Sequence, residues 1–204
     1  MRISDDRYNR DRQNMEMAVR LIRHEARTLT IRQWTGLSDD RIRKLYRTYV
    51  AHQGSRRITR HRGKPPRQVA YFFRNPGRQF QAAQLASLYI VLDLLRISEL
   101  GVESHCEPRS LPACMRLCEA YETYVALHRG ADCLSFEHAW FLLLALTHTR
   151  EIGVTACPGC GGVRLKDLLS HRGGICVHCE QGSLQLQLGD TPSVPEPQVS
   201  AGNP

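Results

Sequence analysis

Two short runs, Cys157-Pro158-Gly159-Cys160 and Cys176-Val177-His178-Cys179, determine how the last part of this chain can fold. Each run holds two thiols three positions apart, so one tight turn can present both to a single ion. Fifteen residues separate the runs, and glycines lie beside both, where the backbone must bend. The spacing predicts that Cys157, Cys160, Cys176 and Cys179 form one tetrahedral site of four thiolates.

Three chemistries use four cysteines in such an arrangement. Zinc favours a closed shell of four thiolates, an iron–sulfur cluster also takes four, and two disulfides need an oxidising compartment. We favour one structural Zn²⁺ per chain, because a two-residue gap suits disulfide pairing poorly and a closed shell leaves no position for a substrate. His171 and His178 lie close enough to replace a cysteine, but we expect both to be solvated loop residues.

Length and composition indicate an ordinary globular protein. The chain has 204 residues, of which 42% are hydrophobic and 24% charged, enough for one good core and a small satellite module. The first residues are charged and no apolar segment follows them, so we expect no secretory signal. The longest apolar run, Ala139 to Leu146, is too short to cross a bilayer. We therefore expect a reducing cytoplasm, which suits cysteines that bind a metal.

The charge of the chain is strongly asymmetric. Residues 1–80 hold 20 Lys+Arg against 7 Asp+Glu, whereas residues 81–204 hold 8 against 13, so the net charges are +13 and −5. Arginine supplies 25 of the 28 basic residues, which reflects either genomic base composition or bidentate phosphate contacts. Under both interpretations, the first two-fifths of the chain is where a polyanion would bind.

The basic part has the pattern of a helical hairpin. Apolar residues recur at helical spacing over 13–28, and a second short helix is expected from Thr30 to Thr35. Gly36-Leu37 then turns the chain, and Ser38 is placed to cap a third helix that has two aspartates in its first turn. This order is typical of a helix-turn-helix, although an ordinary hairpin with a solvated charged face has the same pattern.

Two groups of basic residues are the candidates for DNA binding. Three fall on the outer face of the third helix, where they could reach phosphates or guanine edges. The others belong to residues 54–67, in which Pro65-Pro66 blocks a helix; we expect an arginine-rich, flexible arm, although a solvated linker has the same composition. The candidate residues are Arg43, Lys44, Arg47, Arg56, Arg57, Arg60 and Arg62.

The middle of the chain predicts apolar helices. Residues 78–100 form the least polar candidate, which is apolar around most of its circumference and must be central or covered by a partner. Amphipathic helices are expected from Leu111 to His128 and after Ser135. Cys114 and Cys118 lie one turn apart on the buried face of the first of these, so we expect core packing rather than a second metal site, and the Phe72-Phe73 pair should likewise anchor the core.

These observations predict a mainly α-helical bundle with a helix-turn-helix-like N-terminal segment and a small C-terminal zinc module built on four cysteines. The expected parts are a basic helical segment (1–53), the arginine-rich loop (54–77), an apolar helical core (78–152), the zinc module (153–182) and a disordered tail (183–204).

The order of these elements, together with particular runs, resembles a known family. The runs are Leu37-Ser38 followed by Arg43-Lys44-Leu45-Tyr46, Ala139-Trp140-Phe141-Leu142-Leu143, Ala156-Cys157-Pro158-Gly159-Cys160-Gly161-Gly162 and Gly174-Ile175-Cys176-Val177-His178-Cys179. Across residues 13–181 the chain is similar to the FlhC family, the zinc-containing subunits of the bacterial flagellar master transcription activator. The cysteine pattern alone is common to many zinc modules, so the helical order before it carries the resemblance.

The resemblance implies a cytoplasmic DNA-binding protein that acts in a hetero-oligomer of four FlhD and two FlhC subunits. That complex binds upstream of flagellar operons and helps RNA polymerase to initiate. The family's zinc ligands correspond to Cys157, Cys160, Cys176 and Cys179. The apolar circumference of residues 80–95 is more than a chain of this length easily covers, so we also expect the protein to be poorly soluble or to self-associate alone and to become soluble with an FlhD-like partner.

Two other classes of function compete with this one. A zinc-stabilised RNA-binding module is the alternative, since attraction to phosphate does not distinguish DNA from RNA. An enzyme is not expected, because the sequence has no glycine-rich phosphate loop, no plausible triad and no metal site with an open position.

Overall fold

The structure is a computed structural model that describes residues 3–50, 58–61, 63–98, 101–104, 110–128, 132–170 and 174–180. Several residues named above lie outside these ranges. They are Arg56, Arg57 and Arg62 of the predicted arm, His171 and the tail over 183–204.

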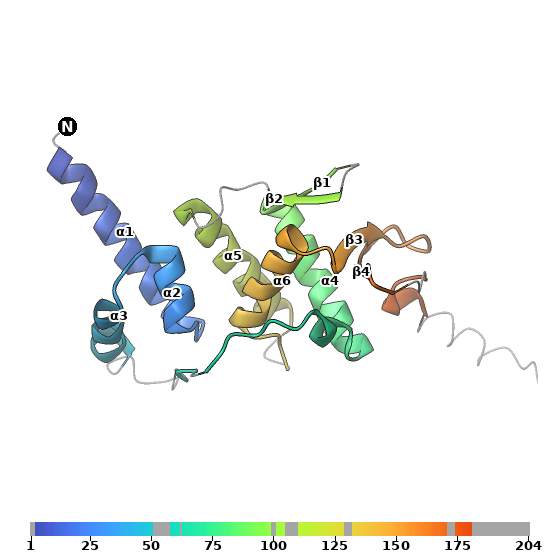
Figure 1. The fold of residues 1–204 in the computed structure, drawn as a ribbon, viewed down its shortest axis with the longest axis horizontal. Helices are drawn as coiled ribbons and strands as arrows, with labels where there is room; N and C mark the ends of the chain where they lie inside the picture. The colour runs from blue at the N-terminus through green and yellow to red at the C-terminus, as the bar shows by residue number, and fades with distance from the viewer. Residues whose placement is uncertain are drawn as a thin grey trace, which may run out of the picture.

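The described residues form a mainly helical protein with two small antiparallel sheets (Figure 1). The basic helices of the N-terminal segment lie at one end, the apolar helices lie in the middle, and the second sheet lies at the other end. Among the described helices, none combines the length and the apolar character needed to cross a membrane. The elements are α1 (Ile3–Arg23), α2 (Thr28–Thr35), α3 (Asp39–Leu45), η1 (Tyr46–Val50), η2 (Val69–Phe73), α4 (Pro76–Val91), β1 (Leu95–Ser98), β2 (Gly101–Ser104), α5 (Leu111–Leu127), α6 (Phe136–His148), β3 (Ile152–Ala156) and β4 (Val163–Asp167).

The turn between α2 and α3 has the geometry that its sequence predicts. Gly36 ends α2 in the left-handed conformation, with a φ of 66°, which glycine adopts without strain. Ser38 then caps α3, because its hydroxyl oxygen accepts a hydrogen bond from the Arg41 N–H. Leu37 and Ile42 are buried beneath this turn, so the hairpin is confirmed as a packed unit. The helix continues beyond α3 as the π-helical turn η1.

Two helix boundaries differ from the predictions for the same physical reason. The helix expected over 13–28 is α1, which begins at Ile3 and already ends at Arg23, and the helix expected over 78–100 is α4, which ends at Val91. Glu25 and Asp93, with φ of 60° and 58°, take the left-handed position after each helix. The next residue in each case donates back into the last turn, Ala26 N–H to Leu21 O at 3.0 Å and Leu94 N–H to Tyr89 O at 2.8 Å, which closes a Schellman motif.

The chain after α4 forms a hairpin where a helix was expected. β1 pairs with β2 in an antiparallel register that places Leu95 opposite Ser104. Leu94 and Leu95 are 2% and 1% exposed, so the apolar residues that suggested a longer helix are buried from a turn and a strand instead.

α4 is the central helix of the protein. It packs against α5, α6, η2, β1 and β4, and its buried side chains include Leu85 and Tyr89. Of its large apolar side chains, only Phe80 and Val91 are exposed. The chain's own described elements therefore cover most of α4, which takes the central position that its apolar circumference allowed. The self-association expected without an FlhD-like partner stays a prediction.

The basic helices and the middle helices share one hydrophobic core. Ile22 of α1, Ile31 of α2 and Phe136 of α6 all belong to it, and so do Phe72 and the two cysteines Cys114 and Cys118. The rings of Trp34 and Trp140 meet with their centroids 4.6 Å apart, which joins α2 to α6. The predictions of core packing for Cys114, Cys118 and Phe72 are thus confirmed.

Candidate functional sites: a four-cysteine centre and a basic helix face

The first cysteine pair lies in the turn of the β3–β4 hairpin. Ala156 pairs with Val163 at the end of the ladder, and the turn between them carries Cys157 and Cys160. Cys157 N–H donates to Gly162 O, and Gly161 N–H donates to Cys157 O, both at 2.8 Å. Gly161 has a φ of 71°, so this turn requires a residue that tolerates the left-handed region. The hairpin holds the pair in place because Leu165 of β4 is buried in the core.

The second pair comes from the end of the described chain and meets the first at short range. Cys157 Sγ lies 3.9 Å from Cys179 Sγ, and Cys160 Sγ lies 3.7 Å from Cys176 Sγ. All four sulfurs lie within 4.8 Å of one another. Four sulfurs at about 2.3 Å from a central ion in a tetrahedron would lie about 3.8 Å apart, so the group has the dimensions of a thiolate shell. Distances of this size exclude disulfides within the group, which need about 2.05 Å.

Backbone N–H groups point at the sulfurs and favour their ionised form. Those of Gly159 and Cys176 donate to Cys157 Sγ at 3.4 and 3.1 Å. These N–H donors, chiefly that of Cys176, lower the pKa of Cys157 to about 6. Cys179 shows the opposite effect, because the crowded thiol groups of Cys160, Cys176 and Cys157 raise its pKa to about 12. A divalent cation would remove this obstacle, since its charge stabilises all four thiolates together.

Close packing leaves little room beside the sulfurs. A Cβ atom on Gly159 would lie 3.3 Å from Cys179 Sγ, and one on Gly162 would lie 3.3 Å from Cys160 Sγ. The four predicted ligands are therefore brought together into one group that could hold a metal ion.

His178 is exposed and does not belong to this group, as expected. Within the described ranges, Cys114, Cys118 and Cys133 form no second group of this kind.

The second candidate site is the basic face of α3, which we extend to Arg47 of the turn η1 that continues the helix. Arg43, Lys44 and Arg47 are all exposed, on the opposite side from the buried Ile42. Arg43 forms an ion pair with Asp40 at 2.7 Å. Within the part of the chain that the structure describes, Lys44 and Arg47 have no ion pair and are available to an external anion.

The described part of the predicted arm, residues 58–61, contacts the helices rather than standing apart from them. Thr59 N–H donates to Glu25 Oε1 at 3.0 Å, and His61 Nε2 lies 3.1 Å from Glu25 Oε2. Arg60 donates to Thr28 Oγ1 at 3.3 Å and places its guanidinium 5.6 Å from the centre of the Tyr46 ring. Arg60 is still exposed, but it is oriented by these contacts. No local pattern indicates them, because Glu25 is 34 residues from Thr59.

Two carboxylates that sequence reasoning missed attach the basic helices to the middle of the protein. Glu122 of α5 accepts two hydrogen bonds from Arg20, at 2.8 and 2.7 Å, and lies 2.8 Å from His24. Glu137 of α6 is only 4% exposed and accepts from Arg27 N–H at 2.8 Å and from the Thr30 hydroxyl at 3.0 Å. A charged residue in the otherwise apolar start of α6 was the one available signal for Glu137.

Comparison with protein-family models and with curated proteins finds no match to this chain. The resemblance to the FlhC family therefore stays a prediction, and the two candidate sites are the evidence on which a function can be argued.

Proposed function

We propose that this protein is a DNA-binding subunit of a transcription activator, and that α3 is the helix that contacts the duplex. The observation that carries this proposal is the basic outer face of α3, whose side chains are exposed while Ile42 anchors the helix to the core. A short helix that follows a tight turn and is fixed on its inner side can enter a major groove with its outer side. Lys44 and Arg47 would then reach phosphates or guanine edges.

The four-cysteine centre would support this function by holding structure rather than by doing chemistry. Zinc is the metal we propose, because a tetrahedral shell of four thiolates is the usual environment of structural Zn²⁺. Cys157, Cys160, Cys176 and Cys179 would hold it, and a filled shell leaves no coordination position for a substrate. The role proposed for the metal is to fix the β3–β4 hairpin to the second cysteine pair.

The biological setting is inferred from the resemblance to the FlhC family. In this setting the chain acts in the cytoplasm with an FlhD-like subunit, in an assembly of four FlhD and two FlhC chains. The assembly binds upstream of flagellar operons and promotes initiation by RNA polymerase. The same helical order and the same cysteine runs support it.

The test is a binding competition with charge variants of α3. The zinc-loaded chain and its FlhD-like partner are titrated with flagellar promoter duplex, with mixed-sequence duplex and with structured RNA. We expect the promoter duplex to bind most tightly, and the variant Lys44→Glu with Arg47→Glu to weaken its binding at least about tenfold, since charge reversal replaces two attractions with two repulsions. Lys166→Glu with Arg150→Glu is the matched control, because both residues are exposed on other parts of the chain.

Two outcomes would contradict the proposal. One is equal or tighter binding of structured RNA, which would favour an RNA-binding module. The other is unchanged duplex affinity in the α3 variant, which would move any nucleic-acid contact away from this helix.

A further inference from the structure

A segment that we call the strap runs from the basic helices to the middle of the protein. It comprises residues 58–61 and 63–68. At its start, Thr59 and His61 are bonded to Glu25, and Arg27 donates to Gly63 O at 2.9 Å. At its end the chain enters η2, where Phe72 is fully buried. The strap is therefore held at both ends, and Pro65 and Pro66 between them lack the N–H groups of other residues.

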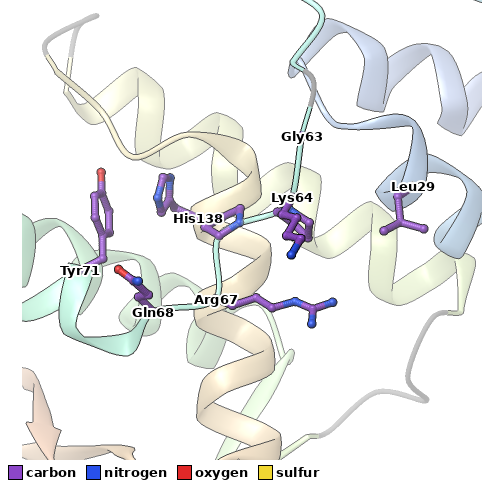
Figure 2. A pocket seen from close by; sticks show the side chains of 9 residues that line it. Leu29, Gly63, Lys64, Arg67, Gln68, Tyr71 and His138 are labelled. Atoms are coloured by element: carbon purple, nitrogen blue, oxygen red, sulfur yellow. The ribbon is translucent and has the colours of Figure 1, made fainter.

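A groove of about 680 Å³ lies along the strap. Lys64 and Arg67 line it from the strap, Leu29 lines it from α2, and Tyr71 and His138 line it from η2 and α6. Figure 2 shows that Arg67 extends toward the side of Leu29, while the rings of Tyr71 and His138 lie on the other side of the strap backbone. Those two rings are stacked, with centroids 4.0 Å apart, and form a firm wall.

The groove continues toward α3. A second hollow of about 480 Å³ is also lined by Leu29, Gly63 and Pro65, and it is bounded by Arg27, Arg43, Arg60 and His61. Arg43 belongs to the basic face of α3, so the two hollows connect that face to Lys64 and Arg67. The basic side chains thus form one continuous track rather than scattered charges.

Of the side chains that the structure describes, the ionisable ones that line the two hollows are basic, apart from the phenol of Tyr71. Among the described residues, no aspartate or glutamate lines either hollow. Lys64 and Arg67 also have no ion pair or hydrogen bond with any described residue, unlike Arg43 and His61, which have carboxylate partners. The pKa of His138 is lowered by burial and further by the guanidinium groups of Arg78 and Arg27, as expected where the local potential is positive. Concave walls of low dielectric concentrate such a potential and favour an anionic ligand.

The extent of the track selects the kind of anion. A single phosphate group needs only one or two cationic side chains, whereas the track provides them in two joined hollows and on the adjacent helix face. A nucleic-acid strand repeats its phosphates about every 3.4 Å along the duplex axis. One strand can therefore contact the cationic side chains of both hollows and of the helix face at the same time. A linear polyanion therefore fits the arrangement better than a small anion does.

We propose that this groove binds the phosphodiester backbone of the DNA that α3 contacts, with Lys64 and Arg67 as the phosphate-binding side chains. The inference rests on the proposed function, because it assumes a duplex at α3. It adds two residues to the predicted DNA contacts and assigns the strap an active part in binding.

The chain offers a direct test because it has only three lysines, Lys44, Lys64 and Lys166. All three are exposed, one on α3, one in the groove and one on β4. The zinc-loaded full chain is acetylated with and without mixed-sequence duplex DNA, and each lysine is quantified by mass spectrometry. We expect the duplex to protect Lys44 and Lys64 and to leave Lys166 unchanged.

Each other outcome has a definite meaning. Protection of Lys44 without Lys64 would overturn this inference and leave the proposed function standing. Protection of neither would overturn both. Equal protection of all three lysines would show non-specific coating by the duplex and would also overturn the inference. The same acetylation is run with guanosine monophosphate, and protection of Lys64 by this nucleotide but not by duplex would overturn the inference too.

A salt titration measures the contribution of the two side chains independently. Lys64→Gln with Arg67→Gln is compared with the matched control Lys166→Gln with Arg150→Gln. Loss of two phosphate contacts should make the slope of log affinity against log salt shallower by about 1.8 and weaken duplex binding about tenfold. The control pair should change neither quantity. A slope that is unchanged in the groove variant would overturn the inference even if the lysine protection were observed.

Discussion

The two ends of the protein are attached to its middle by different forces. At the C-terminal end, the β3–β4 hairpin and the second cysteine pair meet through four sulfurs within 4.8 Å of one another. At the N-terminal end, α1 and α2 are attached through buried side chains, the Trp34–Trp140 contact and the carboxylates Glu122 and Glu137. A metal shell forms or fails as a unit, whereas many separate contacts can be weakened one at a time. The two ends should therefore respond to different perturbations.

The largest effect is expected from removing one sulfur. Cys157→Ser should abolish binding of Zn²⁺, whose apparent free energy in structural sites is about 10–16 kcal/mol and is coupled to folding. Residues 152–170 and 174–180 should then lose their protection from hydrogen exchange, while the helical circular dichroism is largely kept. Elemental analysis together with exchange mass spectrometry measures both.

Cys133→Ser is the control for this comparison, since Cys133 is half-buried and lies outside the metal-binding group. Loss of most helical signal in Cys157→Ser would show that the hairpin and the helices do not fold independently. Purified protein that contains iron, or no metal, would refute the zinc assignment.

A smaller effect is expected at the other end. Glu137→Ala leaves Arg27 N–H and the Thr30 hydroxyl without their buried acceptor, so the free energy of unfolding should fall by about 3 kcal/mol. The amides of α1 and α2 should exchange faster, while the metal content stays unchanged. Denaturant unfolding and hydrogen exchange measure the two effects.

Glu151→Ala is the matched control, because that side chain is exposed and its loss should change stability by less than about 0.5 kcal/mol. Equal destabilisation by the two substitutions would mean that Glu137 does not attach the basic helices in the way described.

The smallest effect is the loss of folding stability when the Glu122 carboxylate is protonated at low pH. Hydrogen bonds from Arg20, and then from His24, hold the pKa of Glu122 below its ordinary value. Because the folded-state pKa is the lower one, this stabilisation is present above the unfolded value of about 4.3 and is lost as pH falls through the folded value. The carboxylate is 42% exposed, so solvent screens the contribution, which should stay below about 1 kcal/mol.

The measurement is the pH dependence of stability in the wild type and in Glu122→Gln. The variant should lose less stability between neutral pH and about pH 3, since it has no carboxylate to protonate. Metal release affects both proteins alike and cancels in the difference. Identical pH profiles would show that Glu122 contributes nothing measurable to this attachment.

Sequence patterns are informative where structure depends on neighbouring residues. Ser38 caps α3 as predicted, and Ser135 caps α6, the helix that was expected after it, because a cap bonds to a residue three positions away. Gly36 marks the end of α2, since glycine is the usual residue in the left-handed position. The four cysteines can be found from spacing alone, and the structure brings all of them together.

Sequence patterns are uninformative where an unusual residue or a distant partner decides the structure. The left-handed positions after α1 and α4 are occupied by Glu25 and Asp93 rather than by glycine, so the sequence carries no stop signal and the predicted helices extend too far. α1 is attached to α5 through the hydrogen bonds of Arg20 to Glu122, and 102 positions separate these two residues in the sequence. A local sequence pattern cannot predict a contact between residues so far apart. The groove along the strap likewise depends on how η2 and α6 meet residues 63–68 in space.

The attachment of the strap at Gly63 and the entry of the chain into the core at Val69 also limit how far the two ends can separate. Six Cα–Cα steps join these positions, and fully extended they span at most about 22 Å. If the contacts of Glu122 and Glu137 broke while Arg27 kept its bond to Gly63, the basic helices would stay tethered to the rest of the protein by this short segment. Their local concentration at the vacated surface would be on the order of millimolar, so rebinding would be fast and detachment brief.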